Sequence, residues 1–463
     1  GIHEIHCQNG AVMFCRQLAF LSSVICLLTV SSVAARDYYV SPEGDDTAVG
    51  SQSQPWQTLG RVNQATLQPG DRVMLAAEQT HPGPLTLDAT DSGSESQPIV
   101  VTTYGDGRAT IDAQTGDAIV IDRCNHVRIT NLKLVGSGRN NGNNGSGVRA
   151  THSEGLEINH VEATGFRMCG VSVDGVHNVR ITHVHAHNNG FAGIASGETA
   201  VSSDLYIAHS IAENNPGEPQ NKHNHSGNGI VVGWGKDVLV EYCRARNNGW
   251  DMPREGNGPV GIWCWNTDRI VIQHCVSHSN RSPGDDGGGF DIDGGTTNGI
   301  LQYNLSYDND GPGYFLCQYP SAPPLTDNII RYNISQNDGR KTNRKAGIDV
   351  FAANEQATGC QIYNNTVFNE HGAAVGFGGL PIHNVVFTNN IFVTKERAVV
   401  GDASHARFHG NVWWTFGESD PKFGDQRSFA EWVAATGHET IDGKQVGIFA
   451  DPLLTAVASA TCE

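Results

Sequence analysis

Aspartates cluster in one short segment of the chain, Asp285-Asp286-Gly-Gly-Gly-Phe-Asp291-Ile-Asp293. Asp291 and Asp293 are two positions apart, so on a strand they share one face with Cα atoms about 6.5–6.8 Å apart. Carboxyl groups separated by roughly 6.5–9.5 Å suit an inverting glycosidase, in which one acid protonates the leaving oxygen and the other activates water. The segment therefore predicts Asp291 and Asp293 as catalytic residues. Aspartates that cap glycine-rich turns are the structural alternative, above all for Asp285 and Asp286.

Glycine-led strands repeat through this region and align the aspartates with aromatic residues. The third positions of successive strands include Trp263, Asp291, Phe315 and Asp349, and the fifth positions include Trp265 and Asp293. If the apolar second and fourth positions point inward, these residues form one solvent-facing patch. Asp349 would lie two strands from Asp291, about 9.6 Å away, and is a third catalytic candidate. Exposed rings beside carboxylates favour stacking on sugar faces, so we expect the aromatic residues to bind substrate.

A second apolar strand follows each glycine-led strand and aligns in one column: Ile129, Ile158, Ile181, Ile207, Val240, Ile272, Leu301, Ile330, Ile362, Phe387 and Phe408. The period of roughly 20–30 residues is typical of a solenoid whose single coils are too small to bury a core. Three positions later, a second column predicts an asparagine ladder between coils: Asn304, Asn333, Asn365, Asn390 and Asn411.

These columns together resemble the right-handed parallel β-helix of pectate lyases, polygalacturonases, alginate epimerases and phage tailspikes. We therefore expect an all-β, single-stranded right-handed parallel β-helix of about eleven coils. An N-terminal cap with a short helix near residues 59–65 should close one end. A helix from Ser428 to Ala435, with Ser428 as N-cap, Glu431 three residues later and Gly437 after its end, should close the other.

The aspartate segment also resembles the Asp-Asp-Gly-aromatic-Asp calcium segment of family-nine pectate lyases. This resemblance implies Ca²⁺ as a cofactor, with Asp285, Asp286 and Asp291 as its ligands. The chain departs from that family by two extra glycines before the aromatic residue. It also reads Gly313-Tyr-Phe-Leu-Cys317 where the family has a lysine base. A lysine base would then come from the next coil, as Lys341 or Lys345.

Long polar turns precede the strands of the patch, and insertions on one side of consecutive coils build the walls of a groove. The turns contain His223 and His225, then Arg254, and then the basic run that ends at Lys345. We expect His223, His225 and Arg254 to contact substrate. Lys345 would serve as the base of a β-elimination, which needs a uronate, a base for the C5 proton and a cation to acidify it. Solvated basic turns and turn-capping histidines are the alternatives.

The sequence thus predicts an enzyme that degrades a polysaccharide, by Ca²⁺-assisted β-elimination of a uronate polymer. Inverting hydrolysis by the paired aspartates and non-catalytic carbohydrate binding or adhesion stay open. The formal net charge of −18 argues against nucleic acid and anionic membranes as partners, because both would be repelled. An acidic polysaccharide can still bind through bridging Ca²⁺, and we expect a monomer. Cys243 and Cys275 fall in one column, as buried thiols or as a disulfide.

The N-terminal residues predict export. Met13, Arg16, an apolar stretch over residues 18–30 and small residues up to Ala35 are typical of a signal peptide, which places the protein outside the cell or in the periplasm. The apolar stretch is shorter than the roughly 20 residues of a membrane span. We divide the chain into a non-native extension with signal peptide (1–35), an N-terminal cap with the first coils (36–117), β-helix repeats (118–412) and a C-terminal capping segment (413–463).

Overall fold

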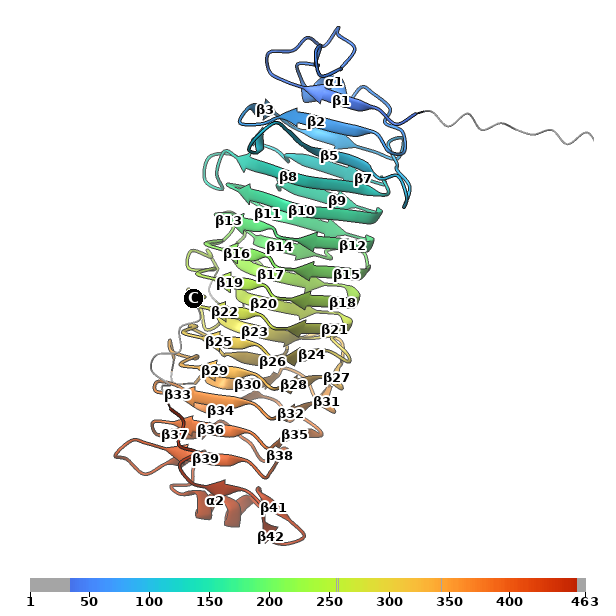
Figure 1. Cartoon of the computed structure of the whole chain (residues 1–463). Coiled ribbons are helices and arrows are strands. Elements are labelled where there is room, and N and C mark those ends of the chain that lie inside the picture. The colour runs from blue at the N-terminus through green and yellow to red at the C-terminus, as the bar shows by residue number, and fades with distance from the viewer. Residues whose placement is uncertain (1–33, 255, 257, 343, 456–463) are drawn as a thin grey trace, which may run out of the picture. The chain divides into compact units, whose positions relative to one another are not determined.

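A computed structural model describes residues 34–254, 256, 258–342 and 344–455. From Ala35 onward the chain forms a right-handed parallel β-helix, whose coils stack from β1 to β39 (Figure 1). The predicted fold class is confirmed. The predicted signal peptide lies almost entirely outside the described residues. Within the described part, no helix is both long and apolar enough to cross a membrane.

One face of the solenoid is a parallel sheet of 13 strands, which carries the glycine-led strands of the sequence. Its strands, in spatial order, are β4 (Leu85–Leu87), β7 (Ile119–Asp122), β9 (Val148–Thr151), β11 (Cys169–Asp174), β14 (Ala192–Ser196), β17 (Asn228–Gly233), β20 (Val260–Trp265), β23 (Gly288–Asp293), β26 (Tyr314–Gln318), β30 (Ala346–Ala352), β34 (Ala373–Gly379), β37 (Arg397–Val400) and β40 (Lys422–Phe423). We call this face the site sheet, because the candidate residues lie on it.

The other two faces belong to one sheet of 26 strands, because the long strands β8 (Val127–Gly136) and β10 (Glu154–Thr164) turn the corner between them. The second face also contains β1 (Asp37–Val40), β2 (Arg72–Ala76), β5 (Ile99–Tyr104), β12 (His177–Thr182), β15 (Ser202–Ala208), β18 (Gly235–Glu241), β21 (Asp268–Gln273), β24 (Ile300–Gln302), β28 (Ile329–Arg331), β32 (Gln361–Tyr363), β35 (Val385–Thr388) and β38 (Ala406–His409). The third contains β3 (Thr80–Pro82), β6 (Ala109–Gln114), β13 (His185–His187), β16 (Ile211–Glu213), β19 (Arg244–Arg246), β22 (Val276–His278), β25 (Leu305–Tyr307), β29 (Ile334–Gln336), β33 (Thr366–Asn369), β36 (Ile391–Thr394), β39 (Val412–Thr415) and β43 (Ile448–Phe449). Two small sheets pair β27 (Leu325–Thr326) with β31 (Ala357–Thr358), and β41 (Thr440–Ile441) with β42 (Lys444–Gln445).

The predicted apolar column lies on the second face in the predicted register. Each of its eleven residues pairs with the next across neighbouring strands, from Ile129–Ile158 to Phe387–Phe408. All of them are buried in the interior of the solenoid. The hydrophobic core is therefore a continuous column that no single coil could form.

The predicted asparagine ladder occupies the turn between the second and third faces. The side-chain amide of Asn304 donates to the side-chain oxygen of Asn333 over 3.1 Å, Asn333 donates to Asn365 over 3.0 Å, and Asn365 to Asn390 over 2.9 Å. The chain of bonds continues through Asn411 to the Glu439 carboxylate. These amides are buried, so each bond satisfies a group that would otherwise be costly to leave unpaired.

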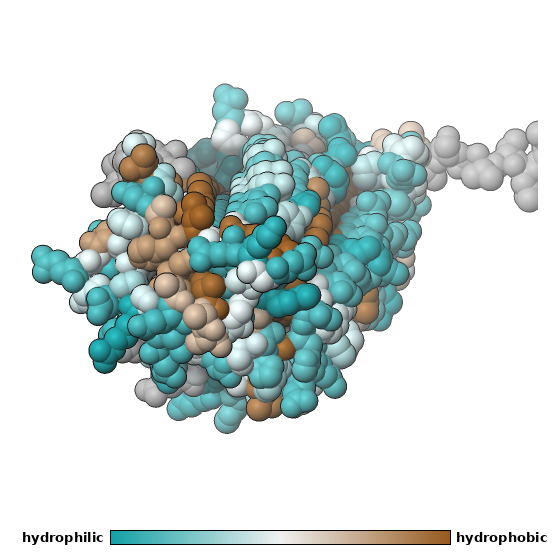
Figure 2. All heavy atoms as spheres, turned by 90° about the horizontal axis from the view of Figure 1, so that it is seen from below, coloured by the Kyte–Doolittle hydropathy of each residue, from teal (hydrophilic) through white to brown (hydrophobic). Residues whose placement is uncertain are grey.

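Both ends of the solenoid are covered. At the N-terminal end the predicted helix is a single turn, α1 (Leu59–Val62), whose N-cap Thr58 accepts a bond from the Arg61 N–H. At the C-terminal end α2 (Phe429–Thr436) has the predicted caps, with Ser428 accepting from the Glu431 N–H and Gly437 left-handed at φ 72°. Its buried Trp432 packs on Phe408 and Trp413 of the last coils. Viewed from this end, the surface is mostly hydrophilic around smaller apolar areas (Figure 2).

Candidate active site

The predicted outward column is in register on the site sheet. Trp263, Asp291, Phe315 and Asp349 are successive partners on β20, β23, β26 and β30. The alternate residues belong to the core: Cys264, Ile292, Leu316 and Val350. Asp291 and its column therefore point away from the solenoid interior, as the alternation of a strand requires.

The predicted solvent exposure of this column is wrong. Asp291 is 4% exposed, Asp349 5% and Trp263 4%, because the long turns before β17, β20, β23 and β30 fold over the site sheet. A pattern of alternating residues says which face a side chain occupies, but not what covers that face. The candidate residues thus lie beneath these turns, in a recess on the outer face of the site sheet.

The recess contains a cavity of about 230 Å³ over β20 and β23. Three carboxyl side chains reach it, from Asp286, Asp291 and Asp293. Its aromatic lining comes from His225, Trp263, Trp265 and Tyr319, and Asn224, Gly258, Val260 and Cys317 complete it. We call this cavity the acid pocket. It combines rings that can stack on sugars with carboxyls that can transfer protons.

Burial controls the protonation of these carboxyls. It raises the pKa of Asp293 to about 7, against hydrogen bonds from the Gly294 N–H at 2.8 Å and the Cys317 thiol. The pKa of Asp291 is raised well above its usual value by burial and by the charges of Asp293 and Asp286. The Asp291–Asp293 pair therefore retains a proton near neutral pH. One oxygen of Asp291 is buried without a hydrogen-bond partner, so it is available to a ligand.

Asp286 differs from this pair because cationic and N–H groups surround its carboxylate. Burial raises its pKa, but the Lys345 ammonium and the Gly258 N–H oppose that rise. Lys345 Nζ lies 3.6 Å from Asp286 and 3.9 Å from Asp349, over the ring of Phe315. Burial lowers the pKa of Lys345, but Asp349 and Asp286 raise it on balance. Lys345 is therefore held as an ammonium ion.

Three predicted residues lie behind the acid pocket and do not line it. Asp349, Phe315 and Lys345 form a layer one to two strands beyond the cavity. Burial raises the pKa of Asp349 to about 7, against the attraction of Lys345. In this arrangement Lys345 links Asp349 to Asp286. The structure thus places two of the four predicted catalytic side chains, Asp291 and Asp293, in the pocket.

The three predicted calcium ligands point to different partners. Asp285 is exposed and pairs with Arg344 at 3.0 Å, whereas Asp286 pairs with Lys345 and Asp291 faces the cavity. Among residues 34–254, 256, 258–342 and 344–455, no cluster of three His, Cys, Asp or Glu side chains has metal-binding geometry. Calcium binding at Asp285, Asp286 and Asp291 stays a prediction.

The predicted substrate-binding residues in the turns separate into two groups. His225 lines the acid pocket, and its ring meets the Trp263 ring edge-on at 4.7 Å. Burial and Arg254 lower the pKa of His225 to about 4, so the imidazole is neutral. His223 and Arg254 lie outside the lining, where the Arg254 guanidinium donates to the His223 carbonyl over 2.7 Å.

Sequence reasoning missed Asn228, which holds the aromatic wall in place. Its side-chain oxygen accepts from the Trp263 indole N–H at 3.1 Å, and its amide donates to His225 Nδ1 at 2.9 Å. It also missed Tyr319 and Cys317 as lining residues. A buried asparagine needs several hydrogen-bond partners, but the burial of Asn228 depends on the turns over the site sheet and is not visible in the sequence.

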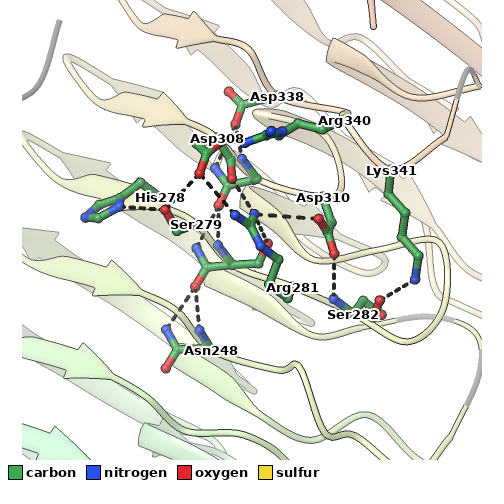
Figure 3. A network of polar contacts seen from close by, with 12 residues as sticks. Asn248, His278, Ser279, Arg281, Ser282, Asp308, Asp310, Asp338, Arg340 and Lys341 are labelled. Atoms are coloured by element: carbon green, nitrogen blue, oxygen red, sulfur yellow. Dashed lines mark hydrogen bonds and ion pairs between the residues drawn. The ribbon is translucent and has the colours of Figure 1, made fainter. Parts of the chain in front are cut away.

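A polar network braces the turns beside the acid pocket (Figure 3). Arg281 lies between Asp308 at 3.0 Å and Asp310 at 3.6 Å, and Asp308 also pairs with Arg340. Lys341 donates to the carbonyls of Ser282 and Gly284, the latter over 2.6 Å. These bonds join the turn that carries Asp286 to the turn that carries Lys345. Lys341 thus has a positioning contact and is not aimed at the cavity.

The cysteines of the described region are free thiols, including the neighbours Cys243 and Cys275. The Cys243 N–H lies 3.4 Å from Cys275 Sγ, and both residues are buried in the turn column. Cys317 lines the acid pocket, but burial raises the pKa of its thiol far above the usual value. Burial also raises the pKa of the Cys169, Cys264 and Cys275 thiols, so these lack the lowered pKa of a reactive cysteine.

Comparison with known proteins finds solved structures with a similar fold. A GH136 lacto-N-biosidase from Eubacterium ramulus has a similar structure, with a TM-score of 0.58 and 20% identity over 76% of this chain and 68% of that one. Pectate lyase Pel9A has a TM-score of 0.46 and 18% identity, covering 90% of this chain and 89% of that one. A rhamnogalacturonan lyase has a TM-score of 0.44 and 15% identity, covering 87% and 99%.

Identities this low show the fold alone, and no curated protein sequence matches the chain. The family assignment comes from a family model for the Pel9A-like, right-handed β-helix region, which matches residues 38–390. That span contains every coil that contributes to the acid pocket. The chain belongs to the Pel9A-like family of right-handed β-helix proteins.

Proposed function

We propose that this protein is a glycoside hydrolase that cleaves a polysaccharide or oligosaccharide in the acid pocket. The observation that supports this most is the set of three carboxyls that line one cavity beside two tryptophans: the buried Asp291 and Asp293 and the partly buried Asp286. Glycosidic hydrolysis needs one carboxyl that carries a proton and one that does not. Burial raises the pKa of all three carboxyls, and at Asp286 the Lys345 ammonium and the Gly258 N–H oppose the rise, which makes Asp286 our candidate for the unprotonated carboxyl.

The Asp291–Asp293 pair would act as the general acid. It holds a proton near neutral pH because burial raises the pKa of both groups, and Asp291 has a buried oxygen free to meet the glycosidic oxygen. Donating this proton lets the leaving group depart as an alcohol.

Asp286 would act as the general base. The Lys345 ammonium and the Gly258 N–H favour its ionised form, so it can accept a proton from the water that attacks the anomeric carbon. The proton gained by Asp286 and the proton lost by the pair balance over one turnover. Lys345 and Asp349 would then be positioning residues, since neither lines the cavity.

Calcium-assisted β-elimination is the second candidate, on the strength of one observation. The buried, unpaired oxygen of Asp291 and the adjoining carboxylates of Asp286 and Asp293 are oxygen donors of the kind that Ca²⁺ prefers. When bound, Ca²⁺ would acidify the C5 proton of a uronate. Lys345 suits the role of base poorly, because Asp349 and Asp286 stabilise its protonated form.

Product analysis tests the proposal directly. The wild type and Asp291→Asn would be incubated with neutral and acidic polysaccharides, with Ca²⁺ or with a chelator. We expect new reducing ends without ultraviolet absorbance, unaffected by chelator, and a loss of about 10²–10⁴-fold in the variant. Asp106→Asn, in an exposed turn, is the matched control. An absorbing, unsaturated product that vanishes with chelator would instead establish elimination, and full activity of Asp291→Asn would exclude this pocket as the active site.

We further propose that the protein is exported and works as a monomer. The apolar N-terminal stretch of the sequence supports export, and the net charge of −18 opposes self-association through mutual repulsion. Detection of the mature chain in the culture medium or periplasm, beginning near residue 36, would test the first point. Sedimentation would test the second.

A further inference from the structure

A second cavity of about 390 Å³ adjoins the acid pocket on its N-terminal side. The two cavities share Asn224, His225 and Trp265 in their linings. We call the second cavity the apolar chamber. Because the two cavities share these lining residues, they lie side by side, and neighbouring units of one chain can occupy them.

The floor of the apolar chamber continues the column of the catalytic carboxyls. Ala195 of β14 pairs with Val231 of β17, Val231 with Trp263 of β20, and Trp263 with Asp291 of β23. Ala195, Val231 and Trp263 belong to an apolar cluster outside the solenoid core, to which Phe191 and Trp265 add partly buried surface. The protein already buries Ala195, Val231 and Trp263, so the apolar surface left for a ligand is mainly that of Phe191 and Trp265, which stay partly exposed.

Trp265 forms the wall between the two cavities. Its indole packs over Gly233, where an added Cβ would lie 2.5 Å from Trp265 Cε2. Only a glycine at this position lets the ring lean across β17. The ring therefore faces both cavities, and one sugar unit on each side can contact it.

The lining of the apolar chamber, within the part of the chain that the structure describes, contains no cation that would bind an acidic ligand. Glu198 and Glu218 contribute carboxyls to its lining, and none of the lining residues described is a lysine or an arginine. Glu218 is paired with Arg167 at 3.6 Å, behind the lining. Arg167 compensates Glu218, and burial raises the pKa of Glu198, so a uronate or sulfate placed here would gain no ion pair, whereas a neutral sugar needs none.

We infer that the apolar chamber is a subsite for a neutral sugar unit next to the scissile bond, whose apolar face or substituent packs on Phe191, Val231 and Trp265. This inference rests on the proposed function, since it assigns the acid pocket to the bond that is broken. It narrows the substrate to glycans whose unit on this side is uncharged. Substrate would then run along the solenoid axis from β23 toward β14.

Binding measurements test the subsite separately from catalysis. Defined neutral oligosaccharides (cello-, xylo-, manno- and chito-oligosaccharides) and acidic ones (oligogalacturonates and oligoalginates) would be arrayed and probed with Asp291→Asn. We expect binding to at least one neutral series and to neither acidic series. Phe191→Ala, made in the Asp291→Asn protein, should weaken that binding on the order of tenfold. Phe416→Ala is the matched control, because that ring is 42% exposed and stacks on Phe368 away from the chamber.

Several outcomes would overturn the inference. They are binding to an acidic series, no binding to any neutral series, or neutral binding that Phe191→Ala leaves unchanged. Met168→Ala is a second test should Phe191→Ala unfold, as judged by its melting temperature. Phe191-dependent neutral binding without cleavage by the wild type would keep the subsite and refute the hydrolase. Asp291-dependent cleavage without dependence on Phe191 or Met168 would keep the hydrolase and refute the subsite.

Discussion

Asp338 is a buried carboxyl at the end of a second ladder, which the sequence did not predict. The ladder occupies the turn between the third face and the site sheet, where Asn215, Asn248, Asn280 and Asn309 each donate to the next residue over 2.7–2.9 Å. The last acceptor is Asp338, which also accepts from the Ser335 hydroxyl at 2.7 Å. Asp338→Asn would keep the accepting oxygen and remove the charge.

The pKa of Asp338 gives the size of the effect. Burial raises it from 3.8 to about 6, against hydrogen bonds from Ser335 and Asn309. A shift of about 2 units at about 1.4 kcal/mol each corresponds to about 3 kcal/mol. Because the folded-state pKa is raised, the stabilisation is complete below pH 3.8 and is lost as the pH rises through 6. The unfolding free energy of Asp338→Asn, taken relative to the wild type at the same pH, should therefore be higher at pH 7.5 than at pH 4 by up to about 3 kcal/mol.

Urea unfolding of the two proteins at pH 4 and pH 7.5 measures this difference. The other carboxyls titrate alike in both proteins. Their contributions therefore cancel when the unfolding free energy of the wild type is subtracted from that of the variant at each pH. Asp442→Asn, in an exposed turn, is the control and should show no such difference. An equal effect of Asp338→Asn at both pH values would refute the reasoning, because the carboxyl would then titrate alike in the folded and unfolded chain.

Three further predictions concern the ladder and the site. Asn333→Ala should leave ladder groups unpaired and lower the unfolding free energy by roughly 1–3 kcal/mol. Asn140→Ala, at an exposed position, should cost little. Equal melting temperatures of the two variants would mean that the ladder does not stabilise the fold. Lys341→Met should lower kcat/KM on the order of tenfold without changing its pH dependence, because Lys341 only holds the turn that carries Asp286. A shifted pH dependence would assign Lys341 a titrating role. Lys345→Met should raise the pKa of Asp286, so the acid limb of the pH–rate profile should move to higher pH. Turnover abolished at every pH would instead favour Lys345 as the base of an elimination.

The sequence predicted the solenoid because its regular columns are set by strand geometry. Residues such as Ile272 and Leu301 must pair for every coil to bury its apolar side chains, so their spacing is visible in the chain. The ladder from Asn304 was found for the same reason, since it follows that column at a fixed distance. The outward direction of Asp291 followed from the alternation of β23 alone.

The second ladder also keeps a fixed distance, because Asn215, Asn248, Asn280, Asn309 and Asp338 each lie eight residues after a member of the apolar column. Asn248, Asn280 and Asn309 each precede a turn of different length, so an alignment on the glycine-led strands does not bring them into one column. The burial of the site depends on turns, which follow no such rule. The cover over Asp291 and the position of Lys345 behind the cavity depend on the paths of those turns. Hydrogen bonds between distant turns, such as that from Lys341 to Gly284, fix those paths and leave no period in the sequence.

The ladder and the variable turns are connected, and the connection explains how this fold supports a site. Each long turn begins just after a ladder residue, as with Arg281 after Asn280 and Arg340 two residues after Asp338. The ladder bonds hold the coil at that point whatever the length of the turn that follows. Turns can therefore lengthen into walls while Asp291, Phe315 and Asp349 stay in register beneath them. This separation lets buried carboxyls with raised pKa values collect on one sheet, because the solenoid core and its ladders, and not the site, provide the stability.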